Sequence, residues 1–115
     1  MNPAHTLQAV VAASAVVLFA VGGPVSAADA KAGRAKAQMC QACHGIDGLS
    51  KVPDAPNIAG QVEGYLATQL QAFKSGARKS EAMSLVASTL TERDIENLAA
   101  YFSAIEIRIG KIPGE

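Results

Sequence analysis

The chain has 115 residues, which is room for one small domain. Its 10 Lys and Arg side chains balance its 10 Asp and Glu side chains, which excludes bulk electrostatic attraction to nucleic acid or anionic lipid. Aromatic residues make up 4% of the chain and tryptophan is absent, so little large apolar material is available for a core.

The N-terminal segment has the pattern of a secretory signal. Residues 9–21 are an unbroken run of apolar and small residues, too short for a membrane span and suited to a signal peptide. The sequence GGPVSA follows and offers a small-residue cleavage site after Ala27. We therefore predict a signal peptide over residues 1–27, export to the periplasm, and a mature domain over residues 28–115. Because Lys and Arg are missing near the start, an uncleaved membrane tether is the alternative.

Helical patterns follow in the mature chain. Residues 29–41 are rich in Ala, Lys, Arg, Gln and Met, which predicts a first helix. Residues 45–60 are rich in turn formers and predict a loop. A second helix is predicted where apolar residues recur at helical spacing: Val62, Leu66, Leu70 and Phe73. Gly76 is expected to end it.

The clearest helix start is LTERDI. Thr91 can cap the helix while Asp94 reaches back to it, and Leu90 can pack against Ile95. The apolar stripe continues through Leu98, Phe102 and Ile105. Because no strand-forming stretch precedes the end of the chain, we predict an all-α domain of three to five short helices.

A short extension begins at about residue 105. In IEIRIGKIPGE, Ile105, Ile107 and Ile109 alternate with Glu106 and Arg108, which is strand periodicity. We expect the isoleucines to fold back over the domain's own apolar surface. The alternative is an exposed edge for a partner.

The sequence CQACH contains both cysteines, Cys40 and Cys43, followed by His44. Zinc needs three or four donors, and no second Cys/His pair is present. A redox dithiol normally lies where a strand meets a helix, and a Cys40–Cys43 disulfide closes too small a loop to stabilise a domain. In Cys-x-x-Cys-His both thiols add to the vinyl groups of haem and the histidine ligates iron. We predict one covalent haem c held by these three residues, with the other chemistries as alternatives.

The second axial ligand follows by elimination, since Met39 and Met83 are the remaining candidates in the mature chain. Met39 adjoins Cys40, cannot easily cross to the opposite face of the ring, and is expected to pack between helices. Met83 lies between two predicted helices, on a segment able to cover the far face. We predict Met83 as the distal iron ligand, with ordinary core packing as its alternative.

These features together resemble the class I c-type cytochromes, in particular small bacterial mono-haem carriers and the single-haem units of di-haem relatives. The resemblance rests on AGRAKAQMCQACHGIDG, PNIAGQVEGYLATQLQAFKSGAR, Met83 and LTERDIENLAAYF, in that order. It covers nearly all of the mature chain and implies the cytochrome c fold around one haem.

The resemblance also implies roles for single residues. Gly33 would lie where the first helix crosses the last, against Tyr101. The carbonyl of Pro56 would accept the proton of the proximal histidine. Three residues are implied near the haem propionates: Arg78, Gln61 and Tyr65. Arg78 is the strongest of these because a guanidinium pairs a carboxylate in a fork. A turn proline and a surface arginine are the plainer interpretations.

The haem would be the redox centre, and the protein would hold, insulate and tune it. Because His/Met ligation leaves no open iron position, we expect no enzymatic activity. We predict a periplasmic one-electron carrier whose partners are redox proteins, without nucleic-acid partners and without membrane association after cleavage. The alternative is a haem c subunit docked to a periplasmic dehydrogenase.

Overall fold

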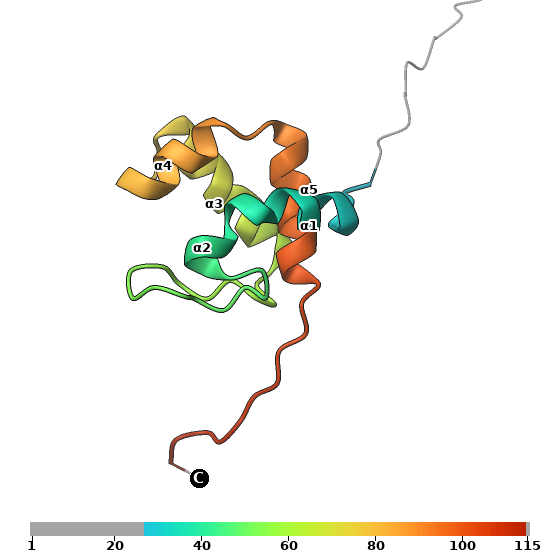
Figure 1. The fold of residues 1–115 in the computed structure, drawn as a ribbon, viewed down its shortest axis with the longest axis vertical. Coiled ribbons are helices and arrows are strands. Elements are labelled where there is room, and N and C mark those ends of the chain that lie inside the picture. Colours follow the sequence, from blue (N-terminus) through green and yellow to red (C-terminus); the bar gives the residue numbers. More distant parts are fainter. Residues whose placement is uncertain (1–26, 115) are drawn as a thin grey trace, which may run out of the picture.

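The computed structural model describes residues 27–114, so all but the last residue of the predicted signal peptide lies outside the described residues. The elements are α1 (Ala30–Lys36), the 3₁₀ turn η1 (Ala37–Met39), α2 (Gln41–His44), α3 (Glu63–Ser75), α4 (Glu81–Ser88) and α5 (Glu92–Ser103). No strand occurs in residues 27–114, which agrees with the predicted all-α class (Figure 1). Within the same residues, no helix has the length and apolar character needed to cross a membrane.

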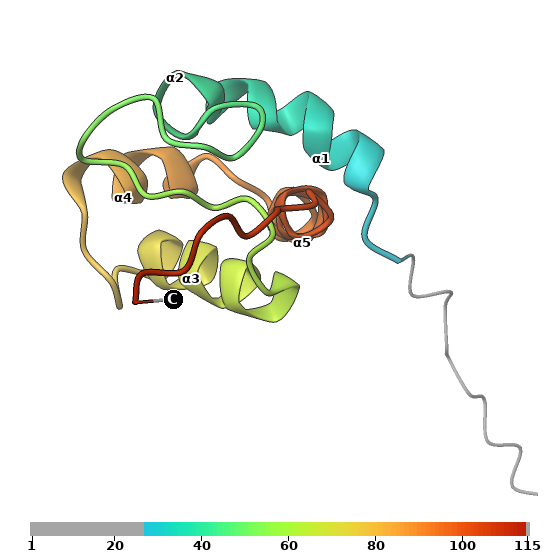
Figure 2. The ribbon, with the colours of Figure 1, turned by 90° about the horizontal axis from the view of Figure 1, so that it is seen from below.

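Helices α1 and α5 cross at Gly33 (Figure 2). A Cβ atom at Gly33 would lie 2.8 Å from Tyr101 Cβ and would overlap the backbone of Asn97. Asn97 Oδ1 also accepts a hydrogen bond from the backbone N–H of Asp29, at 2.7 Å, and the Asp29 side chain caps α1. The close approach of Gly33 and Tyr101 that the resemblance implies is therefore present.

The predicted first helix is broken into three pieces. Helix α1 ends at Lys36 and the chain continues as η1, in which Ala37 is completely buried. Cys40 then caps the single turn of α2. A 3₁₀ turn is tighter than an α-helical one, and this change of winding carries the chain into the CQACH segment.

Helix α3 ends as predicted, with Gly76 in the left-handed conformation at φ 81°. Leu66 is buried, but Val62, predicted on the same apolar face, is 69% exposed. Val62 is the residue before the first turn of α3, so it does not share the buried side of the helix. The face of α3 toward the interior therefore begins at Leu66.

Helix α4 was not predicted, because residues 77–90 were expected to connect two helices. The Ser80 side chain caps it by accepting a hydrogen bond from the backbone N–H of Met83, at 3.2 Å. Met83 is therefore held on a helix rather than on a connecting loop.

Helix α5 has the predicted capping box, in which Thr91 and Asp94 each accept from the other's backbone N–H. Leu90 and Ile95 are both buried, as the expected staple requires. The buried apolar residues form one small core: Ala37, Leu66, Leu90, Ile95, Leu98, Ala99 and Phe102. Phe102 is the one aromatic side chain among these seven residues, so the core is small.

The loop and the C-terminal extension meet beside α5. The backbone N–H of Gly60 donates to the Phe102 carbonyl at 2.9 Å, and Ile105 packs against the core. Ile107 and Ile109, however, are 58% and 82% exposed. The expectation that all the isoleucines cover the domain is therefore wrong for Ile109, because the chain leaves the body after passing Gly60 (Figure 1).

Candidate haem site

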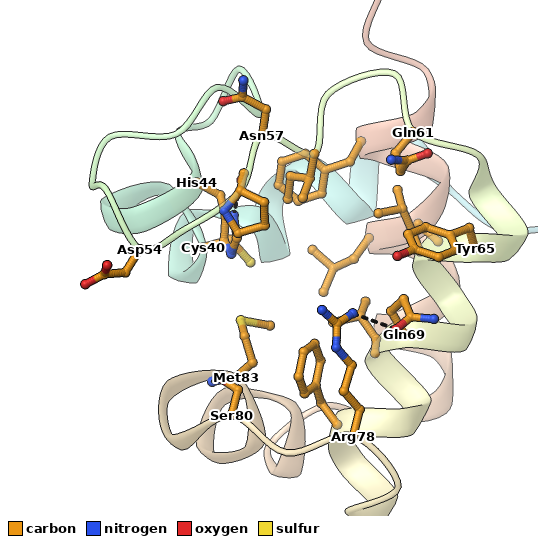
Figure 3. Close-up of a pocket in the computed structure, with 18 of the residues that line it drawn as sticks. Cys40, His44, Asp54, Asn57, Gln61, Tyr65, Gln69, Arg78, Ser80 and Met83 are labelled. Atoms are coloured by element: carbon orange, nitrogen blue, oxygen red, sulfur yellow. Dashed lines mark hydrogen bonds between the residues drawn. The ribbon is translucent and has the colours of Figure 1, made fainter.

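A cavity of about 360 Å³ lies between the CQACH segment with its following loop on one side and helices α3 and α4 on the other (Figure 3). Its apolar lining comes mainly from α3 and α5: Leu66, Leu70, Phe73, Leu98, Ala99 and Phe102. Four residues of the small core also line this cavity: Leu66, Leu98, Ala99 and Phe102. The domain therefore has room at its centre for a large apolar group.

The CQACH segment forms one wall. Cys40 is half-buried and lines the cavity, whereas Cys43 is exposed, and both thiols are free. The backbone N–H of His44 donates to the Cys40 carbonyl at 2.9 Å, so the three residues lie on a single helical turn. Burial raises the pKa of the Cys40 thiol, and the positive charge of Lys36 offsets this in part.

His44 is buried, and its ring is oriented by the loop. Nδ1 lies 2.8 Å from the carbonyl oxygen of Pro56. A carbonyl oxygen can only accept, so Nδ1 carries a proton and Nε2 is the nitrogen left to bind a metal. His44 lines the cavity, which makes Nε2 a donor available to a metal.

Met83 enters from the opposite side of the cavity, on α4 (Figure 3). Its thioether points toward the space beside His44 and Cys40. Met39 does not line the cavity and is 41% exposed. The expectation that Met39 packs between helices is therefore wrong, because its side chain projects outward from η1.

Arg78, Gln61 and Tyr65 all line the cavity. The guanidinium of Arg78 donates to Gln69 Oε1 at 2.6 Å and lies 4.6 Å from the centre of the Phe73 ring. Sequence reasoning did not single out Gln69 for the site, although it lies one helical turn after Tyr65. Asp54, Asn57, Lys79 and Ser80 also line the cavity and were not proposed for the site.

The alternatives to haem find no support in this geometry. No group of three His, Cys, Asp or Glu side chains within residues 27–114 could hold a metal ion, and Cys40 and Cys43 are not joined. A strand-to-helix junction, the usual setting of a redox dithiol, is absent from the same residues. A haem fits this site. The two thiols lie on one helical turn, the His44 imidazole is oriented by Pro56, the Met83 thioether enters from the opposite side, and the cavity has apolar walls.

Comparisons with known proteins agree with this fit. The sequence model of the cytochrome c family matches residues 30–105. A cytochrome c4 from Pseudomonas aeruginosa is 42% identical over 85 residues, covering 74% of this chain and 42% of the relative. The crystal structure of reduced recombinant cytochrome c4 from Pseudomonas stutzeri matches with a TM-score of 0.67 and 42% identity, over 73% of this chain and 49% of that one.

The chain therefore spans less than half the length of the cytochrome c4 relatives that it matches. A thiosulfate dehydrogenase electron acceptor from Thiomonas intermedia is 41% identical over 73 residues, covering 62% of this chain and 33% of the relative. The family match over residues 30–105 includes the CQACH segment and the helices around the cavity. The chain belongs to the cytochrome c family and carries one haem c attached covalently through Cys40 and Cys43.

Proposed function

We propose that the protein is a one-electron carrier whose haem iron is held between His44 and Met83. The observation that carries the proposal is that these two side chains enter one cavity from opposite sides, with His44 already oriented by Pro56. Haem, when bound, supplies the one-electron chemistry, and imidazole–thioether ligation favours the reduced state.

The side chains around the cavity then have separate tasks. Cys40 and Cys43 would hold the haem covalently, and the Pro56 carbonyl holds the proton on Nδ1 of His44, which raises the basicity of Nε2. The apolar residues of α3 and α5 would shield the haem from water along their part of the cavity. Because His44 and Met83 would both bind the iron, they would leave no open site on it for oxygen or peroxide, and we propose electron transfer without catalysis.

Arg78 is proposed to bind a haem propionate. It lies at the cavity with its guanidinium on Gln69 Oε1. A propionate carboxylate is a stronger acceptor than this amide because the hydrogen bond is then between two charged groups. Gln61 and Tyr65, on the same side of the cavity in Figure 3, are proposed to provide further polar contacts there.

The periplasm is the proposed location, and residues 1–27 are the proposed signal peptide, with the mature domain over residues 28–115. Covalent haem attachment through two thiols, together with the apolar N-terminal run, supports export. Donor and acceptor are proposed to be other redox proteins.

A second candidate function is a haem c subunit docked to a periplasmic dehydrogenase. The relative named as an electron acceptor of thiosulfate dehydrogenase supports it. The two functions differ in the affinity for the enzyme and not in the chemistry of the haem. A stable complex that survives purification at micromolar concentration would favour the docked subunit.

The attachment is tested by the intact mass and visible spectrum of the protein purified from the periplasm. The measured mass is expected to equal the mass of residues 28–115 plus that of one haem, and the haem is expected to stay attached during acid extraction. A variant with both Cys40→Ser and Cys43→Ser is the control and is expected to lose the covalent haem. Two free thiols in the wild-type protein would contradict the proposal. A mass that still includes residues 1–27 would contradict only the predicted signal-peptide cleavage.

A further inference from the structure

The chain beyond α5 leaves the domain without a structural partner. Residues 106–112 form neither helix nor strand, and their backbone groups make no hydrogen bond within the described residues 27–114. Figure 1 shows this segment running away from the helices as an open trace. An extended backbone with unpaired N–H and C=O groups is a template on which another strand can pair.

Side chains along residues 105–109 alternate between apolar and charged. Successive side chains of an extended strand point to opposite faces. Ile105 lies at the bend where the segment leaves α5. Once residues 105–109 are extended, the isoleucines at 105, 107 and 109 share one face, and Glu106 and Arg108 share the other. Ile107 and Ile109 are 58% and 82% exposed, so most of the apolar face lacks cover.

The segment is complementary to itself in one antiparallel register. When two copies pair about Ile107, Glu106 of one copy lies opposite Arg108 of the other, and Ile105 lies opposite Ile109. Each of the two charged pairs then joins a glutamate to an arginine, and each isoleucine lies opposite another isoleucine. Opposite charges across a strand pair stabilise it, and like charges destabilise it.

Other registers are less favourable. Centring the pair on Arg108 places two arginines opposite each other, and centring it on Glu106 places two glutamates opposite each other. A slip by a single residue turns the charged side chains toward the isoleucine face. The sequence therefore selects the register centred on Ile107.

The body of each copy can cover Ile109 of the other. Ile105 packs against the core, and the Ile107 side chain lies 3.2 Å from the position of a Cβ at Gly60. Val62, two residues after Gly60, is 69% exposed. Because Ile109 of the second copy would lie beside Ile105, pairing brings Ile109 out of water and onto this surface. Each copy covers Ile109 of the other in the same way, as a two-fold symmetric contact requires.

We propose that residues 105–109 are a dimerisation strand, through which two copies of this chain pair in antiparallel orientation about Ile107. The contact involves few residues compared with a standard interface of about 1,600 Å², so the dimer is weak and dissociates on dilution. The proposal does not depend on the axial ligands or on the electron-transfer partners of the haem.

Sedimentation equilibrium of the haem-loaded protein at low salt tests the proposal. The average mass is expected to rise toward that of a dimer as the concentration approaches about 1 mM, the weak end of specific association. Arg108→Glu places glutamates opposite each other in both charge pairs, and Glu106→Arg does the same with arginines. Each is expected to weaken dimerisation about tenfold or more. Lys111→Glu makes the same charge change as Arg108→Glu outside the paired residues and is expected to leave dimerisation unchanged.

The register is tested by rescue. An equimolar mixture of the Glu106→Arg and Arg108→Glu proteins restores opposite charges in both pairs, so a dimer of one copy of each is expected. The double variant with both substitutions is expected to dimerise like the wild type. The visible spectrum verifies that each variant has folded around its haem. A wild-type protein that is monomeric at about 1 mM, single variants that dimerise normally, or a mixture that associates no better than its components would each overturn the proposal.

Discussion

Nδ1 of His44 lies 2.8 Å from the carbonyl oxygen of Pro56, across the loop that follows the CQACH segment. This hydrogen bond decides which ring nitrogen carries the proton and therefore which one is left to bind iron. Pro56 contributes through its backbone, whose conformation the pyrrolidine ring restricts.

Pro56→Ala is expected to raise the reduction potential. The freer backbone weakens the hydrogen bond to Nδ1, the imidazole becomes less basic, and the oxidised iron loses part of its stabilisation. Protein-film voltammetry measures the change. Pro53→Ala is the matched control, because Pro53 lies in the same loop and does not line the cavity. Equal potentials in all three proteins would show that the Pro56 carbonyl does not tune the iron.

Met83→Ala is expected to keep the covalent haem and to lose the weak near-infrared band of sulfur–iron ligation. Replacing a thioether by water should lower the potential by a few tenths of a volt, within an axial-ligand range of roughly 0.8 V. Met39→Ala is the control, because Met39 is exposed and lies outside the cavity. An unchanged band in the Met83 variant would assign Met83 to packing alone.

Gly33→Ala is expected to reduce the free energy of unfolding by about 1–3 kcal/mol, because the added methyl group overlaps the backbone of α5 at Asn97. A Cβ atom at Gly64, in α3, would have no neighbouring atom within 4 Å. Gly64→Ala is therefore expected to increase the free energy of unfolding by about 0.5–1 kcal/mol. Denaturant unfolding of the holoprotein measures both. Equal effects of the two substitutions would mean that the crossing of α1 and α5 tolerates a side chain.

Asp94 makes stability depend on pH. The backbone N–H of Thr91, with the ammonium of Lys36 at 3.1 Å, holds the pKa of Asp94 below its ordinary value of 3.8. A carboxylate with a lowered pKa stabilises the fold above its unfolded pKa, and that contribution is lost as the pH falls through the folded pKa.

Asp94→Ala is therefore expected to cost about 1 kcal/mol at neutral pH, as loss of a helix cap does. The difference from wild type should shrink as the pH falls below 3.8. Glu96→Ala removes an exposed ion pair with Arg93 on the same helix and is expected to change stability by less than about 1 kcal/mol. A difference for Asp94→Ala that is constant from neutral to acidic pH would contradict the assignment.

Removal of the haem is expected to abolish cooperative unfolding. The core has Ile95 and Leu98 as its largest fully buried side chains, and a chain this small gains little from its own apolar surface. The variant with both Cys40→Ser and Cys43→Ser should show reduced helical content and no sharp thermal transition by circular dichroism. A cooperative, near-native melt of that variant would show that the polypeptide folds without its cofactor.

Local chemistry made α5 predictable and α4 unpredictable. The capping box of Thr91 and Asp94 and the stripe after it are complete within the helix itself. Helix α4 has eight residues, which are too few for a helical repeat to stand out in the sequence. Isolated helices of that length are not stable in water, so α4 depends on its packing against α3.

The haem-attachment residues were predictable because Cys40, Cys43 and His44 are adjacent in the sequence. Arg78 illustrates the opposite case, since its contacts with Gln69 and Phe73 depend on how the chain turns after α3. Likewise, the alternation of Ile107 and Ile109 reveals an extended segment but not its direction. Only the path of the backbone past Gly60 shows that Ile109 points away from the body.

The pairing of α1 with α5 also sets the order in which the chain acquires its structure. The backbone N–H of Asp29 is held by the side chain of Asn97, 68 residues later, so the first helix lacks its partner until the last one has been made. Contacts this distant in sequence form late. We therefore expect the exported chain to pass through an interval in which Cys40 and Cys43 lie in an unfolded segment. Haem can be joined to their thiols in that interval, before the tertiary fold closes over it.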